Sequence, residues 1–195
     1  MSEDVPGSVA EFARICRDFR AGSDRPDVEV REIAAPERIA PHAAAWAAEA
    51  RGVHDLLGTG RLALAFDPEG QSAWGGPVRI IVYLQVPIDT AVAEDALLSE
   101  VAWSWLADAL AEHCPGAAAL AGTVSKTFNT GFGTLARHRA GAMLELRASW
   151  TPDAHRIAGC RAAWVQALAL FAGLPPVADT DAKVTTLPTG IGSHE

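Results

Sequence analysis

Two β-rich runs carry the side chains that are best suited to chemistry. In the run 78–86, VRIIVYLQV, Arg79 and Tyr83 alternate with apolar residues, and in the run 142–150, AMLELRASW, Glu145 and Arg147 do the same. Because alternate residues of a strand share one face, antiparallel pairing would gather these four side chains on one face of a sheet. A carboxylate between arginines can serve as an acid or base. The pattern is typical of a shallow polar site for an anionic ligand.

The same alternation is also typical of a solvated sheet face with ion pairs across strands. Small residues, Ala63 and Ala65, would leave room above the sheet. Four more polar residues are expected on this face: Gln85, Thr123, Ser125 and Thr127. We expect such a face to bind another protein chain rather than to turn over a substrate.

Two aromatic residues and one acid lie outside this pattern. The segment 67–77, DPEGQSAWGGP, has turn chemistry and carries Asp67 and Trp74, so Trp74 either closes over a ligand as a lid or folds back onto the core. In the helical pattern 95–113, Trp103 lies at the edge of a broad apolar arc. We interpret Trp103 as core periphery or as part of a subunit contact.

The sequence gives little support for a metal site, a catalytic nucleophile or a phosphate site. The six histidines and three cysteines lack the spacing of a zinc site, and the serines and cysteines lack a nucleophile motif, so we expect no metal and no cofactor. The stretch 129–133, NTGFG, followed by the basic residues 137–139, RHR, could hold a phosphate. It falls well short of a dinucleotide-binding fingerprint, because no helix is expected after it.

Composition narrows the class of protein. The formal net charge of −8 argues against nucleic-acid binding, which requires a basic surface. No apolar run approaches the roughly 20 residues of a membrane span, and the start MSEDVPGSVAEF is unlike a signal peptide. The three cysteines are odd in number and widely spaced, which disfavours a disulfide framework. We expect a cytoplasmic protein.

Periodicity and breakers predict the elements. A capping box at Ser8 and Glu11 starts a helix that stops at Gly22, and Thr151-Pro152-Asp153 starts the last helix. The alanine-rich run 42–50 is ambiguous between strand and helix, and we favour a strand. The expected helices are 8–21, 95–113 and 151–172. The expected strands are 27–33, 42–50, 61–67, 78–86, 119–128 and 142–150, with residues 51–60 as a loop.

Four stretches resemble a known family. They are FRAGSDRPDVEVREIAAPERIAP, GRLALAFDPEGQSAWGG, EVAWSWLADAL and LELRASWTP, and together they resemble the actinobacterial domain-of-unknown-function 3000 family over roughly residues 10 to 175. The DPxGQxAW and EVAWSW segments are the most specific. The resemblance implies a bacterial cytosolic protein and transfers no catalytic residue.

The element order α-β-β-β-β-α-β-β-α predicts an α+β fold. We expect a two-layer sandwich in which an antiparallel sheet of about six strands carries three helices mainly on one face. Residues 1–7 are expected to be a flexible N-terminus, 8–176 a single domain and 177–195 a loose tail. Two hypotheses follow: a non-enzymatic binding or adaptor module that forms a homodimer, or a small-molecule binding protein or enzyme that uses the polar sheet face.

Overall fold

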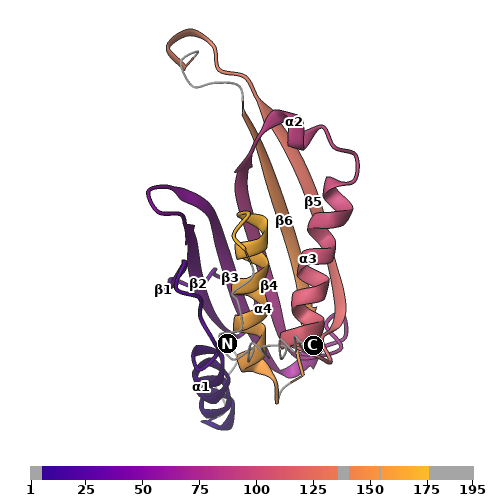
Figure 1. Cartoon of the computed structure of the whole chain (residues 1–195). Coiled ribbons are helices and arrows are strands. Elements are labelled where there is room, and N and C mark those ends of the chain that lie inside the picture. The colour runs from indigo at the N-terminus through magenta and orange to yellow at the C-terminus, as the bar shows by residue number, and fades with distance from the viewer. Residues whose placement is uncertain (1–5, 136–140, 154, 176–195) are drawn as a thin grey trace, which may run out of the picture.

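The fold is built on a six-stranded antiparallel sheet, as the sequence predicts (Figure 1). The computed structural model describes residues 6–135, 141–153 and 155–175. The strand order is β1-β2-β3-β4-β6-β5, and every neighbouring pair is antiparallel. The strands are β1 (Val28–Ile33), β2 (His42–Arg51), β3 (Leu56–Gln71), β4 (Gly76–Ile88), β5 (Ala118–Asn129) and β6 (Gly141–Thr151).

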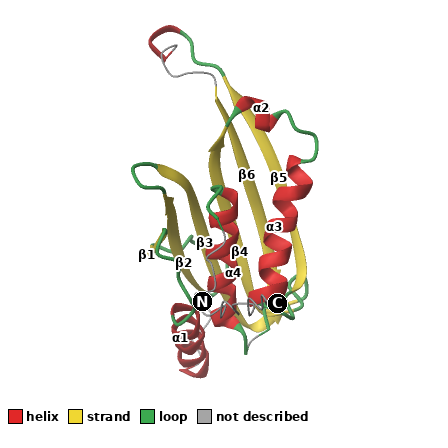
Figure 2. Cartoon of the chain, viewed as in Figure 1, coloured by secondary structure: helices red, strands yellow, loops and turns green. Residues whose placement is uncertain are grey.

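The helices cover one face of this sheet (Figure 2). Helices α3 (Leu98–His113) and α4 (Ile157–Phe171) lie side by side over it, and α1 (Pro6–Arg20) packs against α4 and β2. A four-residue helix, α2 (Thr90–Ala93), and a 3-10 turn, Gly133–Leu135, add to the expected order. The observed architecture is therefore the two-layer α+β sandwich that the sequence predicts.

The core lies between the helices and the sheet because one side of each central strand is apolar. Val82 and Leu84 of β4 point to the helices, as do Leu62 and Leu64 of β3. Each is at most 2% exposed, and burial of one such side chain stabilises the fold by about 1.5–3 kcal/mol. Strict alternation on these strands leaves the polar residues on the opposite face.

The ambiguous run 42–50 is a strand, as favoured. Its Trp46 packs toward the helices, where its ring centroid lies 4.3 Å from that of Phe19. Ala45 and Ala47, on the opposite face, are also buried. Alanines thus occupy both faces of this strand with little exposure, although an alanine-rich run by itself favours a helix.

Several predicted boundaries are wrong. The turn between β3 and β4 spans only residues 72–75, because the two strands extend into the expected turn segment 67–77. Residues 51–60 are not all loop: β3 begins at Leu56, and Gly58 and Gly60 pair in register with β2 and permit close approach of Val86 and Trp164. The last helix does not start at Thr151, which ends β6 and donates a hydrogen bond to the carbonyl of Trp74. The helix begins only at Ile157, because Thr151 is still part of β6 and Asp153 accepts a hydrogen bond from the backbone of His155 in a turn.

Several expectations fall partly outside the described residues. The flexible start (1–7), the basic cluster at 137–139 and the tail at 177–195 lie wholly or partly there. The domain limits 8–176 therefore stay a prediction. The described part of the chain has one connected hydrophobic core.

Candidate functional site

The face of the sheet away from the helices carries a row of basic and aromatic side chains. The pairing register aligns one residue from each of the six strands across the sheet. This cross-strand row, called the arginine row below, consists of Arg31, Ala47, Arg61, Tyr83, Arg147 and Thr123. Three of its six members are arginines, although the whole chain has a formal charge of −8.

A second cross-strand row, called the apolar row below, lies immediately beside the arginine row and has five apolar members and one serine. Its members are Ile33, Ala45, Ala63, Ile81, Ser149 and Ala121. Because Ala45 and Ala63 are small, the sheet surface is low on β2 and β3 and higher at the isoleucines on β1 and β4. The connector after β1, including Pro36, borders the same depression.

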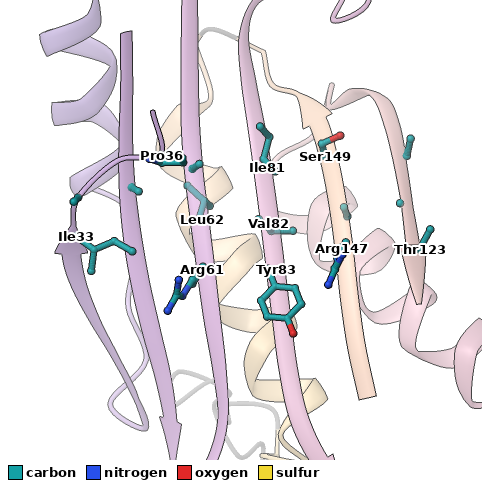
Figure 3. A pocket seen from close by; sticks show the side chains of 16 residues that line it. Ile33, Pro36, Arg61, Leu62, Ile81, Val82, Tyr83, Thr123, Arg147 and Ser149 are labelled. Carbon is teal, nitrogen blue, oxygen red and sulfur yellow. The ribbon is translucent and has the colours of Figure 1, made fainter. Parts of the chain in front are cut away.

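All six members of the apolar row and four members of the arginine row line a hollow of about 950 Å³, whose surface is mainly apolar. Arg61, Tyr83, Arg147 and Thr123 lie along one side of it, each on a different strand, and Ile81 and Ser149 lie on the other (Figure 3). This volume is within the range of small-molecule sites, which are largely apolar with a few polar groups that fix orientation. We call this feature the sheet hollow.

Tyr83 is the centre of a small polar network at the edge of the hollow. The guanidinium carbon of Arg147 lies 5.3 Å from the centroid of its ring, and an Arg147 nitrogen lies 3.7 Å from a Glu145 oxygen. Glu145 also accepts a hydrogen bond of 3.2 Å from Gln85. Burial, followed by the Glu145 carboxylate, raises the pKa of Tyr83. The phenol is therefore neutral at pH 7 and is a hydrogen-bond donor rather than a base.

Arg79 is on the same face but is not part of the hollow. Its side chain is only 8% exposed, and it donates to the hydroxyls of Ser149 and Thr151 at 2.8 and 3.1 Å. Burial lowers the pKa of its guanidinium. Among the described residues no carboxylate forms an ion pair with Arg79, so it adds uncompensated positive charge beside Ser149, which lines the hollow.

Asp67 and Trp74 lie at the end of the β3–β4 hairpin, away from the hollow lining. Asp67 accepts hydrogen bonds from the side chain of Gln71 and the backbone of Glu69, so its carboxylate holds the hairpin end. Trp74 is half-buried, and its carbonyl accepts from Thr151. These contacts fit the capping interpretation of Trp74 better than the lid.

Trp103 lies on the helix side of the sheet. A methyl group at residue 122 would come within 2.8 Å of the Trp103 ring, so the half-buried indole packs directly over Gly122 of β5. It is thus part of the core periphery, and it stands above the last strand of the sheet. The structure brings Tyr83, Glu145 and Arg147 together and separates them from Asp67, Trp74 and Trp103.

Sequence reasoning missed Arg61 and the residues that build the apolar side of the hollow. A usable signal existed for Arg61: the expected strand 61–67 places Leu62 toward the core, so Arg61 must point the other way. No signal identified Ile33 or Pro36, because their position depends on how the connector between β1 and β2 folds over the sheet.

The described residues contain no group of three or more His, Cys, Asp or Glu side chains that could hold a metal ion. Within the same residues, no helix combines the length and apolar character that crossing a membrane requires. The class defined by fold and site is thus an α+β protein with one helix-covered sheet face and one hollowed, arginine-lined face.

A comparison with protein families assigns the chain to a family. A family model described as protein of unknown function (DUF3000) matches residues 8–181, and the chain belongs to that family. No curated protein and no solved structure matches the chain. The function must therefore be argued from the site itself.

Proposed function

We propose that the sheet hollow binds a small amphipathic organic anion, such as a carboxylate with an apolar body. The observation that supports this most strongly is the pairing of the two rows. The apolar row offers a floor of alanine and isoleucine, and the arginine row supplies cations along one side of that floor. A ligand with one charged end and one apolar end matches both rows at once.

The charged end would be held by Arg61, Tyr83 and Arg147. A guanidinium can bind a carboxylate or phosphate through two parallel hydrogen bonds. The phenol of Tyr83 stays protonated because its pKa is raised, so it can donate a third bond. Buried Arg79 adds to the positive potential without touching the ligand.

The side chains of the hollow favour a protein that binds its ligand without catalysing a reaction on it. An acid–base catalyst needs a group that exchanges protons near neutral pH. Tyr83 has its pKa shifted away from neutrality, and Glu145 is engaged by Gln85 and Arg147. The cytoplasmic location is part of the proposal, supported by three free, buried cysteines, as is usual in a reducing compartment.

The test compares decanoate with decanol by isothermal titration calorimetry of the full chain. Both have the same apolar body, but only decanoate carries the charge. We expect decanoate to bind, decanol to bind at least tenfold more weakly, and Arg61→Gln and Arg147→Gln each to weaken decanoate severalfold. Arg17→Gln, an exposed change on α1, is the matched control and should leave binding unchanged.

Equal affinities for decanoate and decanol would show that the arginine row does not bind the charged end of the ligand. No binding of decanoate or of an alkyl phosphate would overturn the proposal. In that case the remaining candidate is a protein chain on the same face, which the exposed Ile81 favours.

A further inference from the structure

The two edges of the sheet differ in how they are protected. β1, at one edge, is only six residues long and carries three charged residues: Glu29, Arg31 and Glu32. Short length and charge are devices that prevent edge strands from pairing with another chain. β1 is therefore a protected edge.

β5, at the other edge, is neither short nor highly charged. It lies at the edge of the sheet beside β6 (Figure 1). It is 12 residues long, contains no proline, and has Lys126 as its one charged residue. The Lys126 ammonium donates to the carbonyl of Asp95, 2.8 Å away, so it is tied back toward the start of α3. No described strand pairs with the outer side of β5. A long, nearly neutral edge of this kind is a template for another strand.

We propose that β5 pairs with β5 of a second copy, in antiparallel orientation, to form one continuous sheet across a homodimer. The backbone groups of an edge strand specify a strand as the occupant. The two edge strands of such a pair meet around a twofold axis, so the surface must complement itself. The sequence of β5 satisfies this condition.

The self-complementarity follows from the positions along β5. If Thr123 or Val124 lies opposite its own counterpart, Lys126 lies opposite Leu120 or Gly122, and no like charges meet. The side chains on the hollow side are then small and uncharged: Ala121, Thr123, Ser125 and Thr127. Since each copy has a net charge of −8, a neutral edge is where two copies approach with the least repulsion.

The geometry of this dimer connects it to the sheet hollow. Antiparallel pairing about an axis perpendicular to the sheet places both helix layers on one side and both hollows on the other. Thr123, which lines the hollow, would lie near the dimer axis. Trp103, packed over Gly122, would stand beside the partner's helix layer. Dimerisation itself does not depend on ligand binding.

The test is sedimentation equilibrium of the full chain and of two double variants. Ser125→Lys with Thr127→Lys adds charge to the hollow side of the β5 edge, where lysines block edge pairing; neither residue lines the hollow. The matched control, Ser23→Lys with Ser72→Lys, adds the same charge at exposed positions away from β5. We expect a dimer for the wild type and the control and a monomer for the β5 variant, with unchanged circular dichroism.

A second measurement maps the contact without relying on those variants. The native cysteines are all buried, so single cysteines at 123, 125 or 127 supply an accessible thiol. A short bifunctional thiol reagent should join two copies through one of these positions, and Ser72→Cys should not be joined. A wild type that is monomeric at every accessible concentration overturns the proposal. So does a dimer that survives the β5 lysines and yields no cross-link.

These outcomes are separate from those of the ligand proposal. A monomer that binds decanoate would remove the dimer and keep the ligand site. A β5-paired dimer that does not bind decanoate would keep the dimer and remove the ligand site.

Discussion

The side chains of Arg147 and Tyr83 stack across the β4–β6 pair, with the guanidinium carbon 5.3 Å from the ring centroid. An arginine over an aromatic face is attracted by the ring, and the contact holds both groups in place. Arg147 is 71% exposed, so one side of its guanidinium remains available to a ligand. A preformed orientation of this kind lowers the entropic cost of binding.

The first prediction concerns the proton of Tyr83. It is the one tyrosine in the chain, so tyrosinate absorption reports this residue alone. Its pKa should exceed the ordinary value of 10.0, first because of burial and then because of Glu145. Glu145→Gln should lower the pKa and Arg147→Gln should raise it, because the carboxylate and the guanidinium act in opposite directions. Shifts in the same direction would contradict the network.

The second prediction concerns the free energy of unfolding at high pH, which depends on the same raised pKa of Tyr83. Because the folded pKa of Tyr83 is raised, the unfolded chain loses this proton first as pH increases. The stabilisation is therefore complete below pH 10.0 and is lost as pH rises through the folded pKa. Urea denaturation between neutral and strongly alkaline pH should show this decline, and Tyr83→Phe should reduce it.

The third prediction concerns Asp27, which pairs with the buried Arg25 at 2.8 Å. Arg25 also donates to Gln166 of α4 and to the carbonyl of Pro175, so it ties the start of β1 to the last helix. Asp27→Asn removes the counter-charge of a buried guanidinium and should cost about 1–3 kcal/mol in unfolding free energy. The control, Glu32→Gln, disrupts the exposed pair with Arg20 and should cost less than about 1 kcal/mol.

The pH dependence of this pair has a definite sign. The hydrogen bond from Arg25 lowers the pKa of Asp27 below its ordinary value of 3.8. Its contribution to stability is present above that value and is lost as pH falls through the folded pKa. The difference between wild type and Asp27→Asn in urea denaturation should therefore shrink in strong acid. A constant difference would show that the charge is not responsible.

The fourth prediction tests the contact between the end of α3 and the start of α4. A methyl group at residue 159 would lie 1.8 Å from the carbonyl oxygen of His113, so the two backbones touch only because residue 159 is glycine. Gly159→Ala should destabilise the fold by more than about 2 kcal/mol, because the buried helices must separate. Gly52→Ala, whose methyl would meet Leu57 at an ordinary 3.4 Å, is the control and should change stability little.

The fifth prediction concerns the buried cation near the hairpin end. Arg79→Met exchanges a guanidinium that has no carboxylate partner among the described residues for an apolar chain, so the change in unfolding free energy should be small. Thr151→Val removes both an acceptor of Arg79 and the donor to Trp74, and should cost about 1–3 kcal/mol. Urea denaturation of both variants checks the order. A larger cost for Arg79→Met would reverse our interpretation.

Much of the candidate site could be read from the strands alone. The alternation in 78–86 and 142–150 places Tyr83, Glu145 and Arg147 on one face, and antiparallel pairing brings them together. Arg79 shares that face, but its burial could not be foreseen because it depends on the hydroxyls of Ser149 and Thr151.

The sequence by itself determined the element order, the antiparallel sheet and the side of each strand that faces the core, because these follow from local periodicity. Only the tertiary structure decided the hollow, because its floor is made of alanines that have no pattern of their own and come from separate strands. It also decided that β5 rather than β1 is the unprotected edge. Strand order in a sheet is set by pairings between distant segments, and such pairings leave no signal in any one segment.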